Sequence, residues 1–215
     1  MAIKKGFSDS KIYAIIAIVI IVIIVITVFF SSNQLNEAII QEQILGIEWS
    51  EDIGEREGGS NHFGLEKWIT YTYRNNEFVY PAYVTLTSLK TLFMMSEDEL
   101  NEKTLETIEK ASDYGIFINE STKISGLRAL KNGHKTRYTI YFGNNTSGEM
   151  IKIIGESWNC GISGTSVICI GVAQVTNNSE INEIFWERII SDKIGTFGSD
   201  DYKNEDGLIY NIKCH

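Results

Sequence analysis

The pattern of hydrophobic and polar positions is dominated by one uninterrupted apolar run near the start of the chain. Residues 12–30 (IYAIIAIVIIVIIVITVFF) contain no charged residue, no Gly and no Pro. At about 1.5 Å per residue, a helix of this length spans roughly 28 Å, close to the hydrocarbon thickness of a bilayer. A segment in lipid must satisfy its own backbone hydrogen bonds, so a helix is the expected state. The run predicts an uncleaved transmembrane signal anchor.

Charge on the two sides of this run predicts its orientation. Of the chain's 19 Lys and Arg residues, three lie within the basic tag at 1–11, whereas only one of its 28 Asp and Glu residues does. The positive-inside rule therefore keeps the tag in the cytoplasm and places the long acidic remainder outside the cell. An acidic surface also disfavours nucleic acid and peripheral binding to anionic lipid, which leaves residues 12–30 as the contact with the bilayer.

Downstream of the run, the pattern first predicts a spacer and then a folded domain. Residues 31–46 have near-helical apolar spacing and predict a helical stalk, and the acidic, Gly-rich residues 47–64 predict a loop. We assign 31–62 to the stalk and acidic loop, and 63–215 to one extracytoplasmic domain.

Two amphipathic helices are expected within that domain. Ser96, followed three residues later by Glu99, forms a capping box before a buried stripe, so a helix should begin there and end near Gly115. A second helix is expected over 179–195, with Ser179 as its N-cap.

Alternating positions predict an antiparallel sheet around these helices. The expected strands are residues 67–74, 79–87, a short segment at 117–118, 135–142, 149–158, 166–176 and an edge strand at 207–214. Short connections favour hairpins, and the nearly continuous apolar run at 166–176 favours a central position. The predicted fold class is α+β: an N-terminal transmembrane helix, then an antiparallel sheet packed with two main helices.

The order of elements resembles a known family. A hairpin, a long helix, a meander beginning ISGLRALKNGHKTRYTIYF and a C-terminal helix resemble the PsbP-like fold. The stretch GESWNCGISGTSVICIGVAQVTN is similar to small membrane-anchored proteins of ammonia-oxidising archaea. The resemblance spans roughly residues 63–214 and implies a non-enzymatic subunit or binding module, with no shared catalytic residue to transfer.

Three cysteines are present, at 160, 169 and 214. Outside the cytoplasm a disulfide is the default expectation. Cys160 and Cys169 flank a predicted hairpin turn, which favours a bridge between them, and Cys160 with Cys214 is the alternative.

Candidate chemistry is otherwise sparse. Cys214 and His215 with His62 or His134 have the donor atoms for copper or zinc, but no metal-ligand spacing is present, and neighbouring strand residues point to opposite faces. We therefore predict no metal, no cofactor and no catalytic residue. The sequence Gly161-Ile162-Ser163-Gly164-Thr165 fails the nucleophile-elbow pattern at its last position.

Four sequons mark possible glycosylation sites, at Asn119, Asn144, Asn145 and Asn177.

These patterns predict a single-pass membrane protein that is not an enzyme and serves as an accessory or scaffolding subunit of a membrane complex, with an unidentified membrane-protein partner. Two alternatives remain open. One is an outer-surface module that binds a ligand or metal. The other is a type IV pilin-like filament subunit, suggested by KKGF at residues 4–7, although pilins begin their apolar run almost directly after this Gly.

Overall fold

The computed structural model describes residues 19–21, 34–61, 65–76, 81–175, 180–190 and 207–215. The chain divides into two compact units, Met1–Gln34 and Leu35–His215; the second is called the body below. Among the residues described, no helix has the length and apolarity needed to cross a bilayer. Of the predicted span at 12–30, residues 19–21 are helical, and the others lie outside the described residues.

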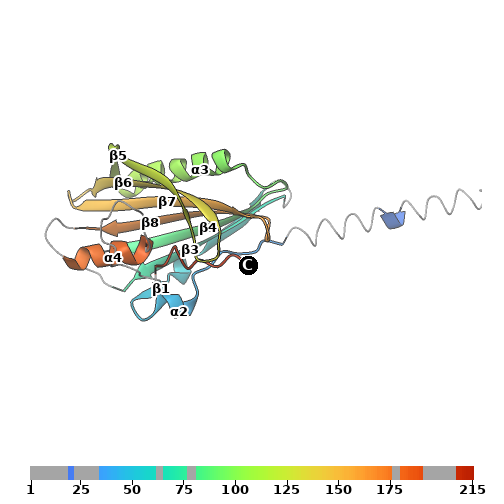
Figure 1. Ribbon diagram of the computed structural model, residues 1–215, viewed down its shortest axis with the longest axis horizontal. Coiled ribbons are helices and arrows are strands. Elements are labelled where there is room, and N and C mark those ends of the chain that lie inside the picture. Colours follow the sequence, from blue (N-terminus) through green and yellow to red (C-terminus); the bar gives the residue numbers. More distant parts are fainter. Residues whose placement is uncertain (1–18, 22–33, 62–64, 77–80, 176–179, 191–206) are drawn as a thin grey trace, which may run out of the picture. The chain divides into compact units, whose positions relative to one another are not determined.

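The body is built on one antiparallel sheet (Figure 1). Its strand order is β1-β3-β4-β8-β7-β6-β5, and β2 pairs with β3 beside this path. The strands are β1 (Trp49–Glu51), β2 (Glu57–Asn61), β3 (Glu66–Asn75), β4 (Ala82–Lys90), β5 (Ile116–Ala129), β6 (Lys135–Asn145), β7 (Met150–Cys160) and β8 (Thr165–Gln174). Strand β8, buried along its whole length, lies at the centre as its apolar sequence predicted.

Helices α3 (Glu97–Glu109) and α4 (Glu180–Ile190) cover opposite faces of this sheet. Both approach it closely at glycines. A Cβ on Gly155 would lie 2.6 Å from Ile108 of α3, and a Cβ on Gly171 would lie 2.5 Å from Ile189 of α4. Because Gly155 and Gly171 have no side chain, α3 and α4 can each pack directly against the strand backbone at these positions.

The face under α4 is completed by chain segments rather than by a second long helix. The backbone N–H of Ala38 donates to Ser88 Oγ over 2.8 Å, and that of Ile40 donates to Tyr73 Oη over 3.1 Å. Residues 207–215 join the same apolar cluster, and Ile39 forms a single antiparallel bridge with Lys213. Short helices α2 (Glu42–Leu45), η1 (Ile53–Glu55) and η3 (Lys110–Tyr114) complete the body.

Both edges of the sheet are interrupted. Short strands β1 and β2 pair with successive halves of β3, and η1 separates them. At the other edge, the pairing of β5 with β6 shifts register between Asn119 and Ile124. This irregularity has the character of a β-bulge, which bends a strand and breaks its ladder.

The predicted fold class, an α+β PsbP-like sandwich with an N-terminal transmembrane helix and two main helices, is wrong. In the part of the chain that the structure describes, antiparallel sheet dominates, with 49% strand against 22% helix and eight strands. The acidic stretch predicted as loop contributes β1 and β2, and the short strand expected at 117–118 is part of the fourteen-residue β5. Strand β1 is only three residues long, and β2 and β5 are largely exposed, so these strands lack the apolar alternation that reveals a strand.

Two smaller predictions also fail. Only Glu42–Leu45 of the predicted helix at 31–46 is helical among its described residues, because much of that segment runs extended along the sheet. The predicted edge strand at 207–214 is a turn followed by the single bridge at Lys213. The helix start at Ser96 is confirmed, since its Oγ accepts from the Glu99 N–H over 3.2 Å.

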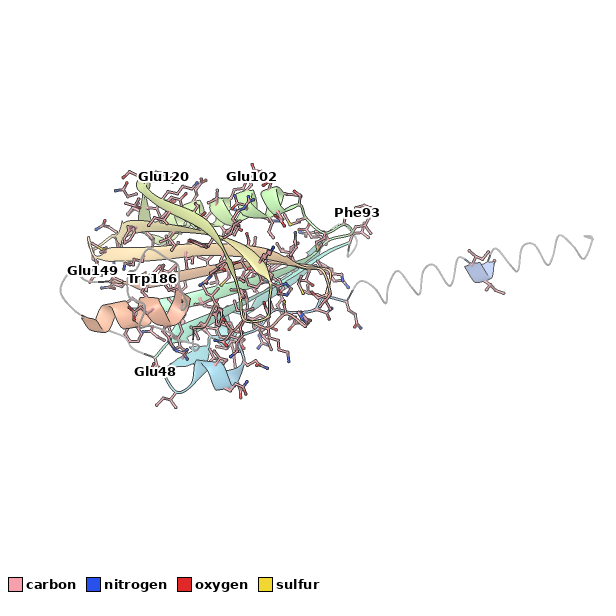
Figure 2. All side chains as sticks on the ribbon, viewed as in Figure 1. Glu48, Phe93, Glu102, Glu120, Glu149 and Trp186 are labelled. Atoms are coloured by element: carbon pink, nitrogen blue, oxygen red, sulfur yellow. The ribbon has the colours of Figure 1, made fainter. Side chains whose placement is uncertain are left out.

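The two ends of the sheet differ in composition. We call one the cysteine end: residues 91–95, the turns at 130–134 and 161–164, and the tail at 211–215. The other, the acidic end, comprises 48–55, 75–76, 110–116 and the turn at 144–149. Figure 2 shows Phe93 at the first end, and Glu48 and Glu149 at the second.

Candidate metal centre

Four side chains with metal-binding atoms converge at the cysteine end. They are His134, Cys160, Cys214 and His215, and their ligand atoms all lie within 4.8 Å of one another. They come from three separate parts of the chain: the β5–β6 turn, the last residue of β7, and the tail. Two thiols and two imidazoles are the donor set of many closed zinc sites.

The distances are close to those of a tetrahedral site. Cys214 Sγ lies 3.1 Å from His134 Nε2, and His215 Nδ1 lies 3.3 Å from Cys160 Sγ and 3.6 Å from Cys214 Sγ. Bond lengths of about 2.0–2.3 Å to zinc place the ligands of a tetrahedron roughly 3.3–3.8 Å apart. A small inward or outward adjustment of these side chains therefore accommodates one ion.

Asn132 positions His134. The side-chain oxygen of Asn132 accepts from the His134 N–H over 3.0 Å, while its amide nitrogen donates to the carbonyl of Ile212 over 2.9 Å. One side chain thus holds both the turn that carries His134 and the tail that carries two further ligands. The Lys131 N–H adds a second link to the tail, donating to the Tyr210 carbonyl over 3.1 Å.

The irregular tail explains how two consecutive residues reach one cluster. In a strand, Cys214 and His215 would point to opposite faces. Here residues 207–211 form a turn, and only Lys213 makes a β-bridge. The alternation of side chains along a strand, which argued against Cys214 and His215 binding the same ion, is therefore absent here.

At Cys214 and His134, the surroundings favour the neutral form before any metal binds. Burial, followed by the neighbouring Cys160, raises the pKa of the Cys214 thiol to about 12. Burial and then His215 lower the pKa of His134. A neutral imidazole is the ligand form of histidine, whereas a thiolate in this setting needs a cation to offset its burial.

A buried donor group lies near the candidate site. The Trp158 indole nitrogen has no hydrogen-bond partner among the described residues. Burial raises the pKa of the Cys214 thiol, whereas Trp158 lowers it. An N–H donor beside a sulfur ligand stabilises metal-bound thiolate.

The structure does not bring Cys160 and Cys169 together. All three cysteines are free thiols. The prediction of a bridge assumed a turn over 161–166, but the turn closes so that Cys160 is paired with Thr165 and Cys169 with Glu156. Four residues of strand, roughly 13 Å, separate the two sulfur-bearing positions, far beyond disulfide geometry. Cys214, the alternative partner, is the cysteine that lies beside Cys160.

The remaining predicted sites are dispersed. Asn119 and Asn144 are exposed on β5 and β6, and Asn145 is partly buried, with its side chain capping the turn to Glu149. Asn177 and His62 lie outside the described residues. The sequence identifies His134, Cys214 and His215 as candidate ligands but not Cys160, because nothing in the local spacing links Cys160 to the tail.

Comparisons of this chain with protein-family models, with curated proteins and with solved structures gave no match. The resemblance to the PsbP-like family and to archaeal membrane-anchored proteins is tested by none of these comparisons and stays a prediction.

Proposed function

We propose that this protein binds one Zn²⁺ ion through His134, Cys160, Cys214 and His215, and that the ion fastens the C-terminal tail to the sheet. The observation that carries the proposal is the convergence of four ligand atoms within 4.8 Å from three distant parts of the chain. Four protein ligands fill a tetrahedral zinc site, so the site is structural and leaves no position for a substrate.

The choice of zinc follows from the donors. A tetrahedral pair of thiolates with a pair of imidazoles suits Zn²⁺, whereas Mg²⁺ and Ca²⁺ prefer oxygen ligands. Thiolate also binds Cu⁺, which makes copper the competing ion in any measurement.

The test is metal analysis of the purified full-length chain, refolded or expressed with Zn²⁺ or Cu⁺ supplied alone. We expect about one equivalent of tightly bound zinc per chain and release of protons on binding, because the thiols must ionise. Cys160→Ser and Cys214→Ser should each lower the zinc affinity by more than about a hundredfold.

Cys169→Ala is the matched control, since Cys169 is buried like the other two cysteines but lies outside the cluster. It should keep full zinc binding. Equal loss in all three variants, a chain that retains only Cu⁺, or a metal-free chain with a Cys160–Cys214 disulfide would each overturn the proposal.

An accessory role in a membrane complex, with the body outside the cell, remains a second proposal supported by the sequence alone. Its support is the apolar run and the absence of a recognised catalytic motif. A strictly monomeric species on native gels of mild-detergent extracts would count against it.

A further inference from the structure

The candidate metal centre also brings two thiols together. Cys160 Sγ and Cys214 Sγ lie within 4.8 Å of each other. One imidazole faces both sulfur atoms, since His215 Nδ1 lies 3.3 Å from Cys160 Sγ and 3.6 Å from Cys214 Sγ. A disulfide requires an S–S distance of about 2.05 Å, so the two sulfur atoms must approach by less than about 3 Å to form one.

The two cysteines differ in how firmly the backbone holds them. Cys160 is the last residue of β7 and is paired with Thr165 of β8 within the sheet. Cys214 follows Lys213, whose N–H donates to the Ile39 carbonyl over 2.9 Å in an isolated bridge. A segment held by an isolated bridge moves at lower cost than a residue inside a sheet. Cys214 therefore supplies the movement that closes a disulfide to Cys160.

The third cysteine lies too far away to take part. Cys169 is paired with Glu156, four residues along β7 from Cys160, and it lies outside the four-ligand cluster. The chain has three cysteines. The intramolecular disulfide that the structure permits therefore joins Cys160 to Cys214.

The imidazoles form the solvent-facing side of the cluster. Cys160 and Cys214 are 0% and 1% exposed, whereas His134 is partly buried and His215 is exposed. The two rings meet edge to face, with their centroids 5.4 Å apart. Rotation of the exposed His215 ring is therefore the shortest route by which a small oxidant reaches the sulfur atoms.

We propose that the site is a redox switch, in which a peroxide oxidises the zinc-bound thiolates of Cys160 and Cys214 to a disulfide and the Zn²⁺ ion leaves. The inference rests on the zinc binding proposed above and adds its regulation. Disulfide sulfur carries no charge to hold the ion, and two imidazoles alone fill half of a tetrahedral site.

The reaction balances with hydrogen peroxide as the two-electron oxidant. One thiolate attacks a peroxide oxygen, the O–O bond breaks, and the sulfur becomes a sulfenic acid while hydroxide leaves. The second thiolate attacks that sulfur, so that the S–S bond forms, the S–O bond breaks and a second hydroxide leaves. Two protons from solvent convert the hydroxides to water, and the zinc ion keeps its oxidation state throughout.

Oxidation changes which parts of the chain are joined. Zinc links the β5–β6 turn at His134 to β7 and to the tail, whereas the disulfide links only β7 to the tail. The turn then depends on the hydrogen bonds that Asn132 and Lys131 make to the tail. We expect the oxidised chain to hold its tail and to loosen residues 130–134.

The test uses the full-length Cys169→Ala chain, reduced, loaded with Zn²⁺ and then treated with hydrogen peroxide. This background is needed because no Lys or Arg separates Cys160 from Cys169, so trypsin leaves both in one peptide. A chromogenic chelator measures the released zinc. Mass spectrometry of tryptic peptides, after free thiols are alkylated, identifies the disulfide.

We expect about one equivalent of zinc to be released for each Cys160–Cys214 disulfide formed. Dithiothreitol followed by fresh Zn²⁺ should restore both the thiols and the bound metal, because a disulfide is reversible. The wild-type chain, treated in the same way, should retain one thiol that can be alkylated, that of Cys169.

Hydrogen exchange separates oxidation from simple loss of metal. The amides of Leu130, Lys131 and Gly133 are all hydrogen bonded, so their exchange reports opening of the turn. In the oxidised chain they should exchange about tenfold faster than in the zinc-bound chain, while the amides of Ile212 and Lys213 change less than about twofold. Chelation of zinc from the reduced chain should accelerate both sets.

The possible outcomes separate this proposal from the zinc site itself. A reduced chain that binds no zinc refutes both. Zinc that is bound but retained after the thiols are oxidised refutes the switch alone. Release of zinc with both sulfur atoms converted to sulfinic acid, or equal acceleration of both sets of amides in the oxidised chain, would also contradict the switch and leave the zinc site standing.

Discussion

The acidic end and the cysteine half of the body hold their arginines in opposite ways. At the acidic end, Arg74 pairs with Asp52 over 3.0 Å and also with Glu55, and these side chains are about 36–49% exposed. Toward the cysteine end, Arg128 donates to both oxygens of Glu156, at 2.8 and 2.5 Å, and these side chains are 7% and 0% exposed.

The two kinds of ion pair differ in how much water still solvates their charges. Water still solvates the exposed pairs, so each contributes little. Glu156 has lost its water and depends on Arg128 and on the Thr136 hydroxyl, which also donates to it. Arg128 in turn donates to the carbonyl of Ile190 over 2.6 Å, at the end of α4. The buried pair therefore links β5, β7 and α4, and its loss cannot be compensated by solvent.

The largest expected effect comes from breaking these two pairs separately. Arg128→Met leaves Glu156 buried without its cation and should lower the free energy of unfolding by about 3–5 kcal/mol. Arg74→Met should cost less than about 1 kcal/mol. Urea unfolding followed by tryptophan fluorescence measures both, and similar costs would show that the burial difference has no energetic consequence.

Metal removal should affect one end only. With zinc at a hundredfold above its dissociation constant, binding stabilises the folded state by about 2.7 kcal/mol, so chelation should lower the melting temperature by several degrees. Hydrogen exchange should accelerate at the described amides of 207–215 and at the 130–134 turn, while β1 at the acidic end stays unchanged. Uniform acceleration across both ends would mean that the ion stabilises the whole body rather than the tail.

Asn132 and Asn145 each accept backbone hydrogen bonds within a turn, one at the cysteine end and one at the acidic end. Their substitutions therefore compare the two ends directly. Asn132→Ala removes the side chain that joins the His134 turn to Ile212, and should weaken zinc binding about tenfold or more. Asn145→Ala removes an equivalent cap at the acidic end, where Asn145 Oδ1 accepts from the Ser147 and Glu149 N–H groups. Competition with a chromogenic chelator gives both affinities, and an equal change would argue against a positioning role for Asn132.

The smallest effect is expected in alkali. Burial raises the pKa of Tyr73 from 10.0 to about 12. The folded state therefore holds this proton more tightly than the unfolded state. Its stabilising contribution is complete below about pH 10 and is lost as the pH rises towards 12. The free energy of unfolding should fall by about 1 kcal/mol between roughly pH 10 and 11.

Tyr73→Phe should reduce that slope, as measured by urea unfolding at a series of pH values. Tyr83, whose pKa burial also raises to about 12, provides a second variant in the same half of β3 and β4. An unchanged slope in both variants would assign the alkaline loss to other groups.

Elements with strong local signals were predictable from the sequence. Ser96 and Glu99 specify the start of α3, and the alternating or continuous apolar runs specify β3, β4, β6, β7 and β8. Strands β1, β2 and most of β5 were not predictable. Most of their side chains face solvent and need not be apolar, so the sequence shows no strand pattern there. Pairing with an already formed neighbour makes them strands, and that information is not local.

The candidate metal site could not be predicted from the sequence for a related reason. Cys160 and Cys214 are 54 residues apart, and His134 lies in a third segment. Their proximity depends on the hairpin register at Thr165 and on the path of an irregular tail, neither of which has a periodic signature.

The broken edges of the sheet bear on how this protein avoids aggregation. A continuous fourteen-residue edge would present an open row of backbone donors and acceptors to any other extended chain. The bulge in β5 divides its ladder into residues 116–119 and 124–129, and the opposite edge is divided between β1 and β2. Each piece is only three to six residues long, so an incoming strand would find no long, regular template at either side. Straightening β5 by deleting three of residues 120–123 would therefore favour fibril formation before it cost much stability.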